Sequence, residues 1–289
     1  MIKKAISILG LLHFCLVSSQ EIPRYVTGSI LGGLGNQLFE IATACAVAWD
    51  NDAEAYFPEL EAIFKHSRTA QHVLHRCRFH PPINKTSIDF STGVYGYNPI
   101  NFVNGMRISG YSQNEKYFLH HKERISNLFS PTSRDMKYIY KRYGKLLKEP
   151  KSVAVHIRYY YQEKPDDASF LQYDEEYYEK AMSLFDSDSL FVVFSDNMEF
   201  AHKIIRPNGR KVKFIQNEPC HIDFYLQSLC KHNIIANSTY SWWAAWLNKN
   251  PSKIVVRPAR WIGGYPDIGG PDEWVKIEAS TYQEKNESF

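Results

Sequence analysis

The stretch HIDFYLQSLCKHNIIANSTYSWWAAWLN, residues 221–248, decides the fold class that the sequence predicts. Its apolar spacing indicates a short helix, a brief buried strand from His232 to Ala236, and a second helix that carries three tryptophans. Asn237, Ser238 and Thr239 follow the strand, so they end it and can cap the next helix. A buried strand that runs through a polar loop into a helix is typical of α/β proteins.

The same loop is a candidate anion site. The first turn of a helix presents free N–H groups and a positive dipole end. Small hydroxyl side chains, here Ser238, Thr239 and Ser241, let a phosphate come close to those groups. An ordinary capped helix with its tryptophans in the core has the same spacing, so the spacing alone leaves both interpretations open.

Two predicted strands upstream end in polar residues. Residues 152–157 (SVAVHI) form a buried parallel-type strand, with His156 and Arg158 at the end where open α/β sheets bind ligands. The guanidinium fork of Arg158 suits a diphosphate, and a structural ion pair is the alternative. Residues 189–194 form the next strand, which ends in Ser195 and Asp196. The Asp196 carboxylate can accept hydrogen bonds from the N1–H and 2-amino group of guanine, or cap a helix over residues 197–205.

The N-terminal half begins with a similar strand, turn and helix. A strand from Arg24 to Leu31 leads into a glycine-rich turn, residues 32–37 (GGLGNQ), and then into a helix from about Gln37 to Trp49. Glycines at such a turn let another group approach the backbone closely. The pattern lacks the third glycine of the dinucleotide fingerprint and has no Gly-Lys-Ser/Thr, so neither a Rossmann dinucleotide site nor a Walker loop is predicted.

The rest of the chain is predicted with less detail. Residues 66–105 carry no clear periodicity and are expected to be irregular. Helices are predicted from Asn114 to Leu128 and from Arg134 to Leu147, and the second leads to Pro150, the expected domain boundary. Further strands are predicted over residues 53–57, 106–111 and 211–215, a helix over 174–185, and a last strand over 253–256.

Several of these stretches resemble the motifs of one enzyme family, the family 11 glycosyltransferases or α-1,2-fucosyltransferases. Residues 223–247 match its C-terminal motif DFxLMxxCKHxIxxNSTFSWWxAWL almost residue for residue. Residues 32–39 (GGLGNQLF) resemble its N-terminal GGLGNQxFQ signature, with Glu40 in place of the usual Gln. Residues 110–113 (GYSQ) and 194–196 (FSD) resemble its GYxQ and FSDD elements. Of its HxRRGDY motif, His156 and Arg158 remain, and tyrosines stand at 159–161.

The resemblance covers about residues 27–260 and implies a GT-B-like α/β fold, in which two Rossmann-type doubly wound domains face a central cleft. We expect an acceptor-side domain over residues 21–150 and a GDP-fucose-binding domain over residues 151–289, each with its own core. The implied reaction moves L-fucose from GDP-β-L-fucose to the 2-hydroxyl of a glycan acceptor, galactose in the family, with inversion to an α-linkage. The expected donor site comprises Gly33, Gly35, Asn36, Gln37, His156, Arg158, Ser195, Asp196, Asn237, Ser238, Thr239 and Ser241.

The expected catalytic groups are Arg158, which would stabilise the leaving GDP, and a general base. Because Tyr161 replaces the Asp of the family motif, the base candidates are Glu163, Asp166 and Asp167, and we favour Asp166. No DxD-type motif stands at a strand end, so neither a metal nor another cofactor is expected beyond the donor substrate. Two alternatives stay open, a non-catalytic sugar- or nucleotide-binding relative and a fucosyltransferase with another acceptor, such as a protein O-fucosyltransferase.

Composition adds few constraints. The net charge of +3 over 289 residues gives no argument for binding to nucleic acid.

Residues 1–20 have the layout of a secretory signal peptide or signal-anchor, which would allow membrane association through that segment. The expected location is the secretory pathway or Golgi in a eukaryotic host, and the membrane or cytoplasm in a bacterial one. Asn84 and Asn286 would then be glycosylation candidates, whereas Asn237, also in a sequon, is expected to be buried.

Cysteine and histidine residues show no metal-type spacing. Cys45 and Cys230 lie on apolar helical faces and are expected in the core, whereas Cys77 and Cys220 could form a disulfide in a secreted protein. His72, His75 and His80 fit no common zinc pattern and have no carboxylate close in sequence, so we expect them on the surface.

Overall fold

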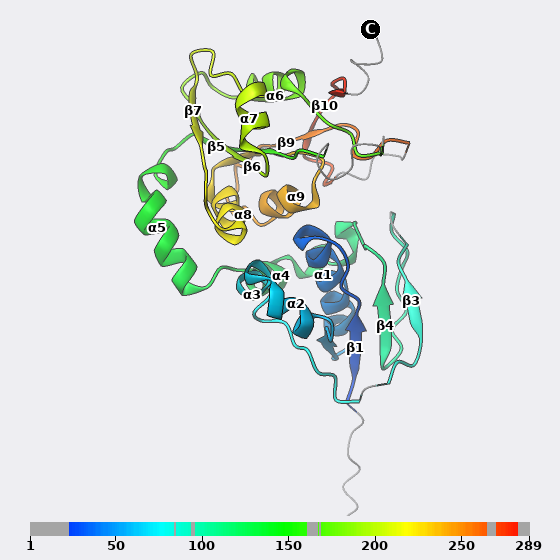
Figure 1. The fold of residues 1–289 in the computed structure, drawn as a ribbon. Coiled ribbons are helices and arrows are strands. Elements are labelled where there is room, and N and C mark those ends of the chain that lie inside the picture. The colour runs from blue at the N-terminus through cyan, green and yellow to red at the C-terminus, as the bar shows by residue number, and fades with distance from the viewer. Residues whose placement is uncertain are drawn as a thin grey trace, which may run out of the picture.

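The computed structural model describes residues 23–83, 85–93, 96–160, 167, 169–264 and 270–282. It contains two parallel sheets, one from each half of the chain (Figure 1). The first has the order β2-β1-β4-β3, built from β1 (Tyr25–Gly28), β2 (Glu54–Tyr56), β3 (Asp89–Ser91) and β4 (Met106–Ser109). The second has the order β10-β9-β8-β5-β6-β7, built from β5 (Ser152–Ile157), β6 (Leu190–Ser195), β7 (Lys211–Phe214), β8 (His232–Ile234), β9 (Val255–Pro258) and β10 (Val275–Ile277).

The second sheet is covered on both faces, as a doubly wound fold requires. Strand β5 lies inside this sheet and is buried at every residue, because alternate side chains enter different clusters. Val153, Val155 and Ile157 pack with α6 (Glu175–Met182) and α7 (Met198–Ile204). Ala154 packs on the other side with α8 (Cys220–Leu229) and α9 (Thr239–Trp246). A continuous apolar run such as SVAVHI is therefore explained by a strand that meets no solvent on either side.

Helix α1 (Leu34–Asp50) connects the two halves. It packs against β1 of the first sheet and against α9 of the second half, and its residues from Leu38 to Ala48 are all buried. The remaining helices of the N-terminal half are α2 (Leu60–His66), α3 (Arg68–Val73), α4 (Lys122–Leu128) and α5 (Ser133–Leu147), with short 3-10 turns η1 (Glu115–Tyr117) and η2 (Leu119–His121). Helix α5 packs on α8, so the segment before Pro150 already belongs spatially to the second half (Figure 1).

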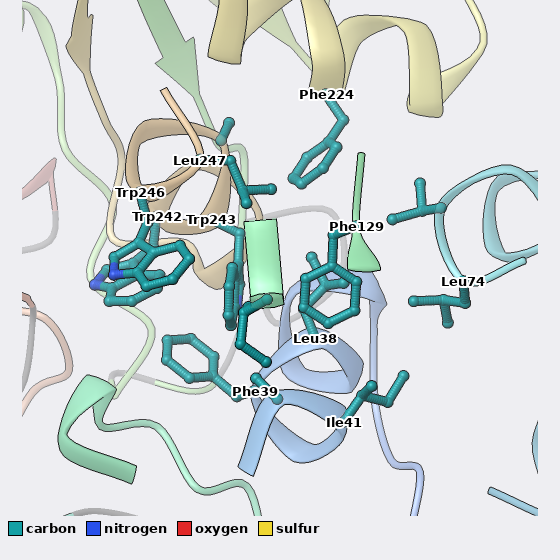
Figure 2. Close-up of a cluster of buried hydrophobic side chains, with 14 of the residues drawn as sticks. Leu38, Phe39, Ile41, Leu74, Phe129, Phe224, Trp242, Trp243, Trp246 and Leu247 are labelled. Carbon is teal, nitrogen blue, oxygen red and sulfur yellow. The ribbon is translucent and has the colours of Figure 1, made fainter. Parts of the chain in front are cut away.

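An aromatic cluster fills the space between α1 and α9 (Figure 2). The Trp243 ring is fully buried and stacks on Phe118, with 5.2 Å between ring centroids. It also meets the edges of Phe39 and Phe129 at 5.0 Å and 5.4 Å. One sheet is formed by residues before Pro150 and the other by residues after it, as the predicted domains are. The aromatic cluster, however, contains residues from both halves of the chain. The N-terminal half therefore shares its core with the C-terminal half, which also has a second cluster of its own.

Three predictions of secondary structure are wrong. The helix expected over residues 114–128 is broken into η1, η2 and α4, because Asn114 caps Lys116 and the Phe118 side chain turns into the shared core. Residues 66–105 are not wholly irregular, since they contain α3 and β3. Strand β9 is not the last, because β10 adds beside it.

Other expectations can be placed as follows. Cys45, Cys77, Cys220 and Cys230 are free, and Cys45 and Cys230 are buried as predicted. Asn237 is buried, as expected for that sequon. The predicted signal segment 1–20 and the sequons at Asn84 and Asn286 lie outside the described residues. Within the described part of the chain, no helix has the length and apolar character needed to span a bilayer.

Candidate active site

A cavity of about 540 Å³ lies where the C-terminal ends of β5 and β6 face the start of α1. Its size is within the range of small-molecule sites. The following expected donor-site residues line it: Gly33, Gly35, Asn36, His156, Arg158, Ser195, Asp196, Asn237, Ser238 and Thr239. Residues more than 200 positions apart in the chain thus meet at one cavity.

Arg158 and Asp196 form the charged wall of this cavity. They follow two strands that pair in parallel with Ile157 opposite Ser195, so both side chains leave the same sheet edge. Arg158 Nη1 forms an ion pair with Asp196 Oδ2, and the backbone N–H of Tyr159 donates to Asp196 Oδ1 at 3.0 Å. The two alternatives weighed from sequence, ligand binding and ion pairing, are therefore compatible, because the paired groups still line the cavity.

His156 is held neutral at this wall. Burial and the neighbouring Arg158 charge lower the pKa of its imidazole to about 3. Its Nδ1 has no hydrogen-bond partner among the described residues, and its ring lies 5.4 Å from that of Tyr240. A neutral imidazole can accept as well as donate a hydrogen bond, so His156 suits a polar ligand better than an anion.

Tyr160, one of the tyrosines that depart from the family motif, makes several contacts at the end of β5. Its hydroxyl donates to the carbonyl of Asn237 at 2.7 Å, and its ring lies 5.3 Å from the Arg158 guanidinium carbon. Its backbone N–H donates to Gln172 Oε1, and Gln172 Nε2 donates back to the Arg158 carbonyl. The tyrosine therefore ties the end of β5 to the loop before α9 and supports the arginine.

Two helix N-termini meet at the cavity. Helix α1 begins after Gly33 and α9 after Ser238, and neither N-cap residue makes a side-chain capping hydrogen bond. Neither first turn carries an acidic residue. The first N–H groups and the positive dipole ends of both helices are therefore left for an anionic ligand.

A close contact fixes the two N-termini together. Asn36 Oδ1 accepts hydrogen bonds from Thr239 Oγ1 at 2.8 Å and from Gln113 Nε2 at 3.1 Å. A Cβ atom at Gly35 would lie only 2.5 Å from Thr239 Oγ1, and closer still to the backbone of Thr239 and Tyr240. This explains the glycine physically, because only a residue without a side chain allows α1 and α9 to approach this far.

Sequence reasoning missed a carboxylate in the cavity, that of Asp223 on α8. Burial and nearby Glu218 raise its pKa to about 7, and its Oδ1 has no hydrogen-bond partner among the described residues. The signal was the helical spacing of Cys220, Asp223 and Gln227, which places three cavity residues on one face. The prediction used only the apolar face of this helix.

Three predicted residues that the structure describes are not part of the cavity lining. The Gln37 side chain donates to the Gly32 carbonyl and does not line the cavity. Ser241 is fully buried, and its hydroxyl donates to the Ser238 carbonyl at 3.2 Å, a contact within the helix start. Asp167 accepts hydrogen bonds from the hydroxyl and backbone N–H of Ser169. Asp166, the favoured base, lies outside the described residues.

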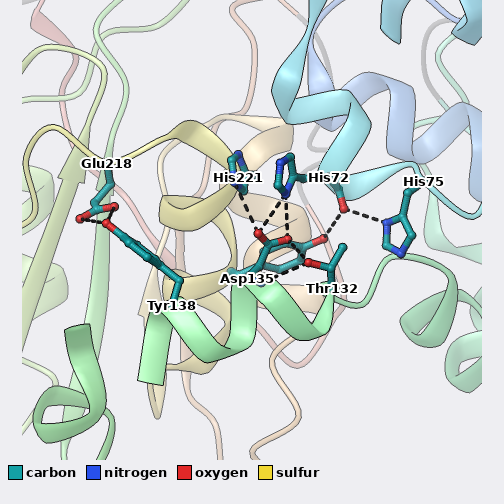
Figure 3. Close-up of polar contacts among 8 residues, drawn as sticks. His72, His75, Thr132, Asp135, Tyr138, Glu218 and His221 are labelled. Carbon is teal, nitrogen blue, oxygen red and sulfur yellow. Dashed lines mark hydrogen bonds and ion pairs between the residues drawn. The ribbon is translucent and has the colours of Figure 1, made fainter. Parts of the chain in front are cut away.

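His72 is partly exposed, but the expectation that no carboxylate lies close to it is wrong. His72 Nδ1 lies 2.9 Å from Asp135 Oδ1, and buried His221 stacks on the His72 ring (Figure 3). The partners come from α5 and α8, so spacing within the chain could not reveal them. This cluster is not part of the cavity lining.

The sequence model of glycosyl transferase family 11 matches residues 16–261, which is most of the chain. The chain belongs to glycosyl transferase family 11. The matched region contains every residue that lines the cavity except Ile262, so the site described above is built almost wholly from family 11 sequence.

Individual relatives of this family 11 chain differ in their sugar. An alpha-1,2-colitosyltransferase of Escherichia coli is 32% identical over 187 residues, covering 58% of this chain and 61% of that protein. The galactoside 2-alpha-L-fucosyltransferase Sec1 of Mus musculus is 27% identical over 297 residues, covering 88% of this chain and 78% of that protein. A solved Arabidopsis thaliana FUT1 mutant in complex with GDP aligns with a TM-score of 0.50 at 12% identity, over 89% of this chain and 74% of that one. At this identity the last likeness shows the fold alone, and the predicted GT-B-like α/β class is confirmed.

Proposed function

We propose that this protein is an inverting fucosyltransferase that moves L-fucose from GDP-β-L-fucose to the 2-hydroxyl of an acceptor galactose. The observation that carries the proposal is the meeting of two uncapped helix N-termini and Arg158 at one cavity. Such an arrangement suits a diphosphate, because backbone N–H groups and a guanidinium fork together offset its charge. The relative named as a galactoside 2-fucosyltransferase supports the choice of fucose and of galactose.

The chemistry requires stabilisation of GDP as its bond to the sugar breaks. Negative charge grows on the leaving phosphate, and donors fixed beforehand lower the barrier most effectively. Arg158 is fixed by its ion pair with Asp196 and by the ring of Tyr160 beside it. In this proposal the start of α9 binds one side of the diphosphate and the turn at Gly33–Asn36 binds the other. The donor is a substrate, and the proposed reaction needs no metal in this cavity.

Besides Asp196, the residue expected to face guanine, two carboxylates are candidates to act on the acceptor hydroxyl or on the base of the nucleotide. Asp166 keeps the role of general base that the sequence suggests. Asp223 projects into the cavity from α8 with an oxygen free of hydrogen bonds within the described residues, so it can accept a proton or a hydrogen bond from a ligand. Separate Asp166→Asn and Asp223→Asn variants distinguish these roles, since loss of a base lowers kcat whereas loss of a nucleotide contact weakens GDP binding.

The decisive experiment measures GDP release from GDP-fucose with lactose as acceptor, in the presence of EDTA. It compares the unaltered protein with Arg158→Ala and with Arg206→Ala, whose guanidinium lies on the surface and pairs weakly with Glu175 at 3.5 Å. We expect acceptor-dependent release that falls at least about 100-fold in Arg158→Ala, the usual cost of losing one leaving-group donor. The Arg206→Ala variant should keep the full rate. An NMR spectrum of the product, showing an α-linkage to the 2-position, tests inversion and regiochemistry together.

Two other outcomes have a defined meaning. If GDP binds but no release occurs with any sugar acceptor, the chain is a binding relative and the transfer proposal fails. If release occurs from a colitosyl donor on the same nucleotide and not from GDP-fucose, the donor assignment fails while the nucleotide site stands. Colitosyl transfer is kept as the second candidate function, because the colitosyltransferase has the higher sequence identity of the two relatives.

A further inference from the structure

Helix α5 carries a row of positive charges along its solvent side. Five basic residues stand three or four positions apart, so they share one face of the helix and its C-cap: Arg134, Lys137, Lys141, Lys145 and Lys148. All five are exposed. We propose that this basic stripe binds the surface of a lipid bilayer that contains anionic phospholipids. The stripe lies outside the cavity lining, and the inference does not depend on the proposed function.

The basic stripe holds an excess of positive charge that the rest of the chain lacks. The whole chain has a net charge of +3, so without these five residues its net charge would be −2. The one acid within α5 is Asp135, which is buried and bonds His72. Among the residues that the structure describes, no carboxylate forms an ion pair with any residue of the stripe. The stripe therefore presents uncompensated positive charge to the solvent.

This arrangement does not favour the helix by itself. Lys137, Lys141 and Lys145 follow one another at four-residue spacing, where like charges repel and destabilise a helix. In α6, by contrast, Lys180 Nζ bonds Glu176 Oε1 one turn earlier, at 2.8 Å. A negatively charged surface against the stripe would offset the repulsion between the lysines. Exposed charges are screened within about 8–10 Å at physiological salt, so such a partner must lie directly on the stripe.

The shape of this region suits a flat partner. At 1.5 Å per residue the stripe is roughly 21 Å long, and Figure 1 shows α5 at the outer edge of the molecule. The apolar side of α5, with Ile139, Tyr143 and Leu146, is buried, and the helix packs on α8. These side chains are therefore not available to enter the hydrocarbon of a bilayer. Binding would be electrostatic adsorption at the lipid headgroups, in which each nearby lysine or arginine adds to the affinity.

Two exposed tyrosines favour a bilayer over nucleic acid as the partner. Tyr138 and Tyr140 are 42% and 58% exposed, and helical spacing places them on the two sides of the basic stripe. Tyrosine is enriched at membrane–water interfaces, where its ring lies at the level of the headgroups. Four of the five basic residues are lysines, whose mobile point charge suits a fluid layer of headgroups. The arginine fork is the group that matches the phosphates and bases of nucleic acid.

Docking of this kind would hold the cavity close to the membrane. The Tyr138 hydroxyl donates to Glu218 Oε2 at 2.9 Å, and Glu218 lines the cavity. Helix α5 also packs on α8, whose first turn carries Cys220 and Asp223 into the lining. A single residue, Glu218, thus joins α5 to the cavity wall. The expected role of the basic stripe is to keep the protein at a membrane surface with the cavity nearby.

The test is sedimentation of the full chain with vesicles of phosphatidylcholine alone, or of phosphatidylcholine mixed equally with phosphatidylglycerol. We expect the protein to sediment with the mixed vesicles and not with the neutral ones, and to be released at high salt, which screens the charges. The double variant Lys141→Gln/Lys145→Gln should bind the mixed vesicles about 25-fold more weakly, since each basic residue near such a surface strengthens binding roughly fivefold. The control Lys65→Gln/Lys203→Gln removes the same charge from exposed lysines on α2 and α7, and should leave binding unchanged.

Four results would overturn the proposal. Equal binding to neutral and mixed vesicles would show that another part of the chain binds lipid. Unchanged binding in Lys141→Gln/Lys145→Gln, or an equal loss in the control pair, would show that the stripe is not the binding surface. Tighter binding to a labelled DNA duplex than to mixed vesicles, at the same salt and phosphate concentration, would assign the stripe to nucleic acid. All four substituted lysines are exposed, so the variants are expected to keep the Tm of the unaltered protein. None of these measurements uses transferase activity.

Discussion

The close approach of α1 and α9 makes Gly35→Ala the most informative substitution in the chain. The added Cβ would stand 2.5 Å from Thr239 Oγ1 and even closer to backbone atoms of Thr239 and Tyr240. Carbon atoms in contact normally lie about 3.5–4.0 Å apart, so the helix starts must separate by roughly 1 Å. Backbone atoms cannot turn aside as a flexible side chain can, and the strain therefore passes to the shared aromatic core.

Two magnitudes follow from that separation. Overpacking of this kind costs about 1–3 kcal/mol of the free energy of unfolding. A displacement of about 1 Å between groups that act on one substrate can lower the rate about 100-fold. Because Asn36 and Thr239 line the cavity from opposite sides of the contact, we expect Gly35→Ala to weaken GDP binding as well as stability.

The assay is urea unfolding together with calorimetric titration of GDP. Gly33→Ala is the neighbouring control for stability alone, since its Cβ meets nothing within 4 Å and its φ of −78° suits any residue, but the residue lines the cavity. Gly144→Ala, in the open on α5, controls for the helix-stabilising effect of alanine. If Gly35→Ala unfolds like these two controls and binds GDP like Gly144→Ala, the contact is not rigid and the reasoning about the paired N-termini is refuted.

Four further predictions concern single side chains. Burial raises the pKa of Glu40 to about 8. Between pH 4.5, the usual pKa of this carboxyl group, and about pH 8, Glu40 is therefore protonated in the folded chain and ionised in the unfolded chain. Stability should therefore fall as pH rises from about 4.5 to about 8, and urea unfolding of Glu40→Gln should lose that slope. Asp223→Asn should weaken GDP binding or lower kcat. If both the affinity for GDP and kcat are unchanged, the carboxylate contacts no ligand. Trp243→Ala should lower the free energy of unfolding by about 3–5 kcal/mol in the same assay. A decrease of less than about 1 kcal/mol would contradict the position of Trp243 at the centre of the core. Tyr160→Phe should destabilise the fold by about 1–3 kcal/mol, because the buried Asn237 carbonyl would lose its hydrogen-bond donor. An unchanged Tm would contradict this prediction.

The apolar spacing of the sequence predicted correctly those strands and helices whose surroundings stay the same along their whole length. Strand β5 has the predicted bounds, because every residue is buried and the apolar run is continuous. The helix at residues 133–147 begins and ends within one residue of its prediction, since Thr132 caps it and its apolar stripe is regular. Residues from four motifs also meet at one cavity, where parallel strands of the second sheet place their C-terminal ends at one sheet edge.

Errors arose where distant contacts decide the outcome. The stretch 114–128 has helical spacing, but Trp246 Nε1 donates to Glu115 and Phe118 enters the shared core, so the chain bends there. Strand β10 is short and largely exposed, and it exists only because β9 offers an edge. His72 meets partners 63 and 149 positions away in the sequence, a relation that no local spacing contains.

The aromatic cluster between α1 and α9 also limits how this protein can be recombined with its relatives. Helix α1 belongs to the first half by sequence, but it packs on α9 of the second half, where its Phe39 ring contacts Trp242 and Trp243. A hybrid that exchanges halves at Pro150 would bring together two surfaces that were never selected as a pair. A hybrid that carries α1 along with the C-terminal half would keep them matched.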